Sequence, residues 1–175
     1  FQIQYDGTNY FIVRAFYPTD TSALPDTAVI SAATHNIYVT AKLDEDNDAQ
    51  AVLAIVQTSQ ASSASLVLGD YDTCGSAVDN PTLGSATLDI TNITVSAYNA
   101  LTLNSTGIGW ISKTGTTLIG MREGHDYQDS AISVSGTNRV FHSASEETGT
   151  SQDPYLLITY TVITGFMSLN TKYWG

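Results

Sequence analysis

The stretch DPYLLITYTV, residues 153–162, decides the fold of this chain. Pro154 can neither donate to a sheet nor continue a helix, so it opens the segment, and residues of high strand propensity follow without a break. Alternate residues of a strand point to opposite sides. We expect a central strand whose more apolar face meets the core, with Leu156, Ile158, Tyr160 and Val162 on that face.

The rest of the chain has the same character, with many short strand patterns and almost no helical periodicity. Strands are predicted at 9–17, 30–42, 51–58, 86–90, 97–103, 117–122 and 139–143. Residues 59–85 are rich in turn-forming residues, so we expect a long irregular region there, with one helical turn near 64–68. Short strands punctuated by Gly, Asn, Asp and Pro favour an antiparallel sandwich. We therefore predict an all-β fold, an antiparallel, jelly-roll-like β-sandwich.

Within the predicted strand 30–42, apolar and polar residues alternate. Ala33, Ile37, Val39 and Ala41 share one face with His35. We interpret His35 as a core histidine whose hydrogen bonds are satisfied. The other predicted strand of note, 9–17, should end at Pro18.

Length and charge limit the class of protein. With 175 residues the chain is long enough for one domain, and we divide it into a sandwich at 1–162 and a C-terminal extension at 163–175, a possible added strand or linker. Charged residues are only 13% of the chain against a usual share of about 25%, which favours an extracellular or virion protein. The net charge is −11, and the six Lys and Arg residues are scattered, which excludes nucleic-acid binding and anchoring on anionic lipid.

Two further classes are excluded by what the sequence lacks. A single cysteine cannot build a disulfide framework or a multi-cysteine metal site. No apolar run reaches the roughly 18 residues of a membrane span. We therefore predict no membrane span.

Six short motifs occur in a fixed order along the chain: RAFYPTDTS (14–22), LPD (24–26), IYV (37–39), GMR (120–122), SASE (143–146) and PYLLITY (154–160). Together they resemble the DNRLRE-type domains, which are jelly-roll modules of bacterial, archaeal and phage surface proteins related to one family of carbohydrate-binding modules. The resemblance implies a partly buried ion pair between Arg122 and Glu146 that ties two strands together. Two departures stand out: only residues 1–8 precede the first motif strand, where that family has another strand or more, and His35 replaces an aliphatic residue.

An acidic loop is the sharpest chemical pattern. Asp44, Asp46 and Asp48 have the alternate spacing that lets three carboxylates converge on a hard cation such as Ca²⁺. The loop is not an EF-hand, because Ala49 and Ile55 stand where that motif needs Gly and Glu. A structural Ca²⁺ site and a simply solvated acidic loop are the two interpretations.

Catalytic patterns are weak. Glu123, His125 and Asp126 look like an acid/base group, and 146–147 adds two carboxylates, but nothing in the sequence brings them to a common pocket. No nucleophile elbow, phosphate loop or His-x-x-His pair is present. We predict a non-catalytic protein, with Cys74 an inert residue of the long loop.

Aromatic residues are the argument for sugar binding, because a flat ring can stack on a pyranose. Tyr71, Tyr127 and Tyr173 are the exposed candidates. Asn92 and Asn104 fit the glycosylation acceptor pattern. The other aromatics lie in strand patterns and are expected in the core or between layers: Tyr10, Phe11, Phe16, Tyr38, Trp110, Phe141 and Tyr160.

The two ends of the chain suggest assembly by strand addition. A short N-terminus leaves a sheet edge open, and 166–174 alternates as an added strand would. The residues expected to contact a neighbouring subunit are Phe1, Ile3, Tyr5, Phe166, Met167, Leu169, Tyr173 and Trp174. The alternatives are that the tail folds back on its own sandwich or links to another domain.

Two functions follow from these patterns. The first is a structural or assembly subunit on the outside of a cell or virion, partnered by copies of itself or by other surface subunits. The second is a carbohydrate-binding module that recognises a polysaccharide.

Overall fold

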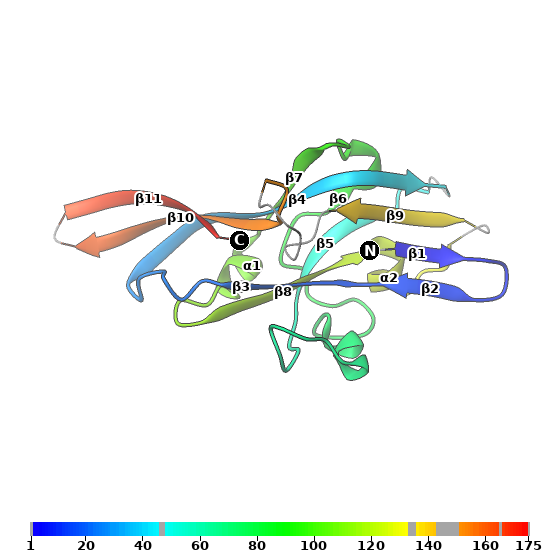
Figure 1. Ribbon diagram of the computed structural model, residues 1–175, viewed down its shortest axis with the longest axis horizontal. Helices are drawn as coiled ribbons and strands as arrows, with labels where there is room; N and C mark the ends of the chain where they lie inside the picture. The colour runs from blue at the N-terminus through cyan, green and yellow to red at the C-terminus, as the bar shows by residue number, and fades with distance from the viewer. Residues whose placement is uncertain (1, 46–47, 133–135, 143–150, 165, 175) are drawn as a thin grey trace.

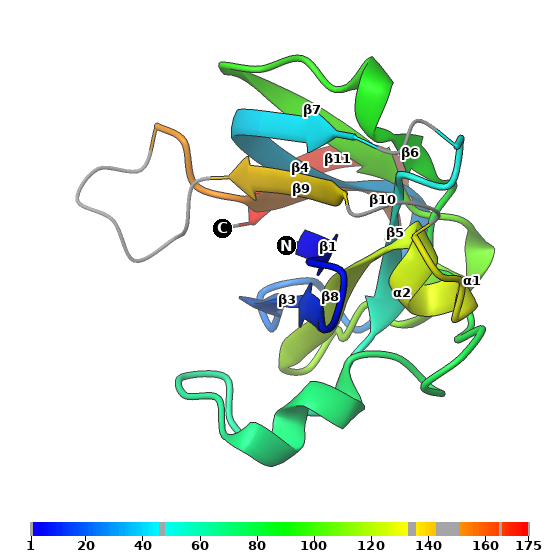
Figure 2. The same ribbon diagram turned by 90° about the vertical axis from the view of Figure 1, so that its right-hand side faces the viewer.

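A computed structural model describes residues 2–45, 48–132, 136–142, 151–164 and 166–174, with the side chains of 163–170 excepted. Strands make up 50% and helices 12% of the chain, and the antiparallel sheets pack in two layers. The predicted all-β sandwich is therefore confirmed. Figures 1 and 2 show the two sheets and the long connection below them.

The larger sheet has seven strands, in the order β11-β10-β4-β9-β1-β2, with β7 on the other side of β4. Its strands are β1 (Gln2–Tyr5), β2 (Tyr10–Val13), β4 (Ala28–Asp44), β7 (Ala97–Thr102), β9 (Thr137–His142), β10 (Tyr155–Thr164) and β11 (Phe166–Trp174). The smaller sheet has the order β3-β8-β5-β6. Its strands are β3 (Ala15–Asp20), β8 (Thr116–Glu123), β5 (Val52–Gln57) and β6 (Leu88–Asp89).

The strand predicted as central, β10, lies between β4 and β11. Leu156 and Ile158 are fully buried, Tyr160 is nearly so, and Val162 packs against the core. The predicted face is confirmed, because burial rewards the apolar side of the pleat. β10 continues to Thr164 without a break at 162, and β11 pairs along its length, so the C-terminal extension belongs to the same sheet.

The long strand β4 organises the larger sheet. Its first half pairs with β10, its second half pairs with β9, and β7 pairs with its middle from the other side. His35, Ile37 and Val39 are buried as the alternation predicts, but Ala41 is exposed. The pairing with β9 shifts register between Val39 and Ala41, and such a bulge reverses the side to which later residues point.

The segment 9–17 is two strands rather than one. The chain leaves the larger sheet after β2 and enters the smaller sheet as β3, with Arg14 at the crossing. Pro18 lies inside β3 instead of ending it, which is possible because β3 is an edge strand and loses no ladder bond there. Tyr10 and Phe11 on the edge strand β2 are 46% and 50% exposed, and Phe141 on β9 is 48% exposed, so their predicted burial is wrong.

The core fills the space between the two sheets, with fully buried apolar residues on β4, β5, β8 and β10. Trp110 closes one side of it by packing its ring directly on Gly84, where any Cβ would collide with that ring. A glycine is therefore required at that point of the long loop. The predicted core role of Trp110 agrees with this contact.

The described residues also form four short helices: η1 (Leu68–Thr73), η2 (Ile90–Asn92), α1 (Ser105–Gly109) and α2 (Gly124–Gln128). The turn expected near 64–68 falls at η1 instead. Residues 124–127 of α2 are buried. In the described part of the chain, no helix is long and apolar enough to cross a membrane.

Both ends of the chain form strands of the larger sheet. β1 lies between β2 and β9, so both of its edges are paired within the chain. β11 pairs with β10 on one side and is the outermost strand on the other, as β2 is at the opposite end of the sheet. The tail thus folds back on its own sandwich, and no other described strand pairs with the outer edge of β11.

Candidate functional site: a groove beside strand β3

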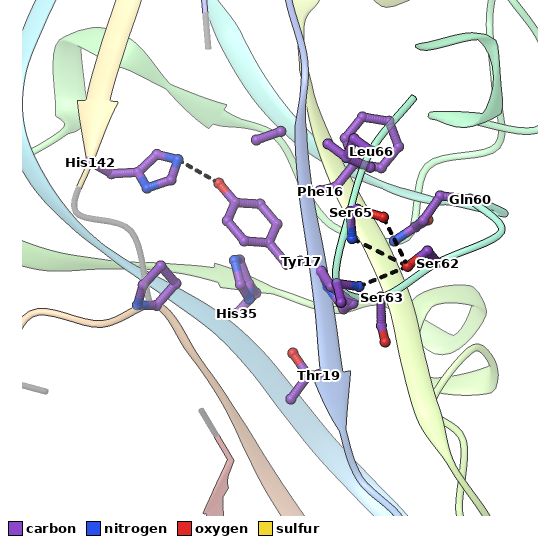
Figure 3. A pocket seen from close by; sticks show the side chains of 14 residues that line it. Phe16, Tyr17, Thr19, His35, Gln60, Ser62, Ser63, Ser65, Leu66 and His142 are labelled. Atoms are coloured by element: carbon purple, nitrogen blue, oxygen red, sulfur yellow. Dashed lines mark hydrogen bonds between the residues drawn. The ribbon is translucent and has the colours of Figure 1, made fainter. Parts of the chain in front are cut away.

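A cavity of about 400 Å³ follows the outer side of β3, and we call it the β3 groove. Its floor is 15–19 of β3. One wall comes from the larger sheet and the other from the loop after β5. Figure 3 shows both walls, with His35 and His142 on one side and Gln60, Ser62, Ser63, Ser65 and Leu66 on the other.

The loop wall has its own local structure. The Ser62 hydroxyl accepts hydrogen bonds from the backbone N–H of Ala64 at 3.1 Å and of Ser65 at 3.2 Å. Serine commonly closes such turns by bonding to nearby backbone. The turn sets serine side chains beside the groove.

Tyr17 connects the groove to the core. The centroid of its ring lies 4.2 Å from that of the His35 ring and 5.5 Å from that of the His142 ring. Its hydroxyl oxygen is 2.7 Å from His142 Nε2. Burial raises the pKa of Tyr17 well above its usual range. Burial, aided by the nearby His142, lowers the pKa of His35 to about 3. Tyr17 and His35 are therefore both uncharged at neutral pH.

His35 and Gln60 are buried without hydrogen-bond partners. They are 1% and 5% exposed, and neither the two ring nitrogens of His35 nor the amide oxygen and nitrogen of Gln60 have a partner in the described structure. His35 is a core residue as predicted, but the expectation that its hydrogen bonds are satisfied is wrong. Such groups are rare in native proteins, because each costs about 1–3 kcal/mol when left unpaired.

The described lining of the groove contains no Asp, Glu, Lys or Arg, and its polar side chains carry hydroxyls, one amide and two imidazoles. Among the described residues, the groove therefore offers no Lys or Arg for a phosphate or carboxylate and no carboxylate for an amine or metal ion.

A second polar cluster, formed by Arg14, Arg122 and Asp126, is tightly paired. Arg122 is fully buried, and its Nε is 2.8 Å from Asp126 Oδ2, while Arg14 Nη2 is 2.8 Å from Asp126 Oδ1. Burial acts to raise the pKa of Asp126, but the hydrogen bonds from both guanidiniums outweigh it and lower that pKa.

Arg122 also holds the long loop in place. It donates to the carbonyls of Ala77 at 3.1 Å and Val78 at 2.7 Å. The ion pair predicted between Arg122 and Glu146 cannot be compared directly, because Glu146 lies outside the described residues. In the described part of the chain, the carboxylate beside Arg122 is Asp126.

The acidic loop meets a buried histidine. His125 Nε2 is 3.1 Å from Asp48 Oδ2, and His125 Nδ1 is 2.9 Å from Glu123 Oε1. Asp48 also accepts a hydrogen bond from the backbone N–H of Gln50 at 2.9 Å. Burial raises the pKa of Glu123 although hydrogen bonds from His125 oppose it.

The contacts of Asp48 with the His125 ring and the Gln50 backbone link the acidic loop to the rest of the fold. Asp44 is partly buried and Asp46 lies outside the described residues. Among the described side chains, no group of three or more His, Cys, Asp or Glu residues gathers as a metal site. Ca²⁺ binding by Asp44, Asp46 and Asp48 stays a prediction.

The three tyrosines expected to be exposed differ. Tyr127 is buried, so that expectation is wrong for it. Tyr71 is 36% exposed and lies under the Arg14 guanidinium at 4.0 Å, whereas Tyr173 on β11 is 69% exposed.

Sequence reasoning missed a row of rings across the larger sheet. Tyr38, Tyr98, Tyr155 and Tyr173 follow one another at centroid distances of 5.4, 5.1 and 5.8 Å, on β4, β7, β10 and β11. The rings are tilted or edge to face, so they stabilise cross-strand packing rather than form a flat platform. Alternation could have placed Tyr38 and Tyr155 on the outer face, but the pairing of distant strands is not visible in sequence.

The remaining predicted residues have mixed positions. Ile3 is buried in the core, Tyr5 stacks on Tyr10 at 4.7 Å, and Trp174 packs against the core. Phe1 and the side chains of Phe166, Met167 and Leu169 lie outside what the structure describes.

Of the two glycosylation candidates, Asn92 is exposed. Asn104 caps α1, and its Nδ2, the atom that would carry a glycan, donates to the Leu83 carbonyl.

Comparisons with protein-family models, with characterised proteins and with solved structures find no match to this chain. The resemblance to DNRLRE-type domains stays a prediction. Function is therefore inferred from the geometry of the β3 groove.

Proposed function

We propose that the chain is a non-catalytic module of an extracellular or virion surface that binds an uncharged carbohydrate in the β3 groove. The observation that carries this proposal is a pair of buried side chains, His35 and Gln60, that have no hydrogen-bond partner among the described residues and lie at the wall of a cavity whose described lining has no Asp, Glu, Lys or Arg. A ligand that hydrogen-bonds both of them would offset the cost of leaving them unpaired.

The chemistry of the lining supports a ligand rich in hydroxyls. A neutral imidazole has one donor and one acceptor, the Gln60 amide has both kinds of group, and a serine hydroxyl does both. A sugar hydroxyl also donates and accepts. Charged ligands are disfavoured, because desolvating a charge without a partner is costly.

A glycan array followed by calorimetry on its hits tests this proposal. Gln60→Leu removes the buried amide with little change in volume, and it should weaken binding by roughly tenfold or more. Ser59→Ala, an exposed residue next to the groove, is the matched control. An array without neutral glycan hits, or full affinity in Gln60→Leu, would contradict the proposal.

A second candidate function is assembly through open sheet edges. β11 is nine residues long and is the outermost strand of its sheet, and β2 is outermost at the other end. Unpaired strand edges are templates for strands of another chain. The Phe1–Tyr5 part of this idea is less favoured, because β1 is already paired on both sides.

Light scattering coupled to size-exclusion chromatography tests assembly. The proposal expects a multimer that dissociates when Thr171→Pro removes a backbone donor from β11. A monomer at all concentrations would count against it.

A further inference from the structure

We infer that the β3 groove binds a carbohydrate chain lengthwise, so that several sugar units lie along β3 and its backbone reads them. This inference rests on the proposed function and specifies the ligand. It starts from the outer edge of β3.

Phe16 and Pro18 turn their backbone polar groups toward the groove. Thr21 N–H donates to Gly115 O at 3.2 Å, which makes residues 21 and 115 a hydrogen-bonded pair. Such pairs alternate along an antiparallel ladder, so the next pairs are at Thr19 and Tyr17, and the residues between them face away from β8.

An independent contact agrees with this pattern. Pro18 is opposite Leu118, and the Leu118 carbonyl accepts instead from Thr58 N–H on its other side, at 3.2 Å. No hydrogen bond to the backbone of Phe16 or Pro18 from outside β3 and β8 is present in the described residues. Phe16 thus offers an N–H and a carbonyl to the groove, and Pro18 offers a carbonyl alone.

Pro18 decides between a sugar and a peptide. An added β-strand exchanges bonds in both directions with every second residue of an edge, and at Pro18 the donor is missing. Proline is a common device that protects edges from strand addition. A sugar hydroxyl needs no such exchange, because it can donate to the single carbonyl.

The length of the floor points to more than one sugar unit. From Ala15 to Thr19 there are four strand steps, which span about 13 Å and exceed one pyranose ring. Figure 3 places Leu66 and His142 toward one end of β3 and Thr19 toward the other, with His35 and Gln60 between these ends. The buried side chains of His35 and Gln60 would hydrogen-bond one sugar unit, and the backbone groups on the outer edge of β3 would hydrogen-bond the units on either side of it.

A length series separates this inference from the proposed function. The probes are neutral gluco-, manno-, xylo- and galacto-configured series from monosaccharide to hexasaccharide, titrated into the full chain by calorimetry. Affinity should rise by at least about tenfold from monosaccharide to trisaccharide in the series that binds. A monosaccharide that binds as tightly as the trisaccharide would overturn the inference and leave the proposed function standing. No binding in any series would overturn both.

Pro18→Ala provides the second measurement. The substitution restores an N–H to the edge and keeps the carbonyl, so trisaccharide affinity should stay within about threefold of the wild type, less than one lost hydrogen bond. An octapeptide of alternating Thr and Val should not bind the wild type. Binding of that peptide, strengthened in Pro18→Ala, would show that β3 accepts a strand and would overturn the inference.

Discussion

Two clusters of polar side chains are buried near β3, and they differ in whether their members are hydrogen-bonded. In the cluster of Arg14, Arg122 and Asp126, each charged side chain is hydrogen-bonded to another or to a carbonyl. In the β3 groove, His35 and Gln60 are also buried but have no hydrogen-bond partner among the described residues. The first arrangement is complete within the chain, whereas the second is the one that we propose a ligand completes.

This difference gives the two regions opposite expected responses to substitution. Removing one member of a paired cluster leaves a buried charge uncompensated. Removing an unpaired polar group relieves a cost, because an apolar replacement has nothing to leave unsatisfied. Stability is therefore expected to fall in the first region and to hold or rise in the second, where binding is expected to fall.

The largest expected effect is that of Asp126→Asn. The change leaves the Arg14 and Arg122 guanidiniums without their shared carboxylate, and it should lower the free energy of unfolding by about 3–5 kcal/mol. Urea denaturation measures it, with the exposed Asp72→Asn as control. A loss below about 1 kcal/mol would show that this cluster does not stabilise the fold.

Acid should destabilise the fold through His35. The pKa of His35 is about 3 in the folded chain against an ordinary 6.5, so the unfolded state binds more protons between these values. The contribution of His35 to stability should be fully present above about pH 6.5 and be lost toward pH 3 with a slope approaching about 1.4 kcal/mol per pH unit. Urea denaturation at several pH values measures this slope, and His35→Leu should remove its His35 part. An unchanged slope in His35→Leu would assign the acid sensitivity to other groups.

The fold was more predictable from sequence than the site. The face of β10 with Leu156 and Ile158 was visible because strand alternation and hydrophobic burial are local rules. The exit of the chain from one sheet at Arg14 was not, since it depends on which distant strands pair. The bulge after Val39 was hidden for the same reason.

The groove was harder to predict from the sequence, because its central residue, His35, departs from the apolar pattern of its strand face. His35 stood out in sequence as a histidine on an apolar face, and a core role was the simplest interpretation. Its missing partners follow from what β3 and the loop at Gln60 place around it, which no local pattern encodes. Asp126 was likewise named for possible acid/base chemistry, although its position between two guanidiniums makes it structural.

At neutral pH, His35→Leu should change the free energy of unfolding in the opposite direction to Asp126→Asn. The replacement removes two unpaired ring nitrogens at similar volume, so the free energy of unfolding should be unchanged or rise by about 1–2 kcal/mol. Carbohydrate affinity should fall in the same protein. Urea denaturation and calorimetry measure the two effects, and a loss of stability above about 2 kcal/mol would mean that His35 is bonded in solution.

The smallest expected effect is at Tyr17. This residue shares features of both regions, since it is hydrogen-bonded like the Arg14, Arg122 and Asp126 cluster but lies in the β3 groove. Its hydroxyl is paired, 2.7 Å from His142 Nε2, while its ring contacts the unpaired His35 at 4.2 Å. Tyr17→Phe deletes only the hydroxyl, so the ring contact and the burial of the ring remain. The free energy of unfolding should fall by about 0.5–1.5 kcal/mol, the usual net value of one hydrogen bond. Tyr173→Phe, on an exposed tyrosine of β11, is the matched control and should change nothing measurable. If Tyr17→Phe instead stabilised the fold as His35→Leu is expected to, the Tyr17 hydroxyl would belong with the unpaired groups of the groove, and the boundary between the two regions would lie at His142.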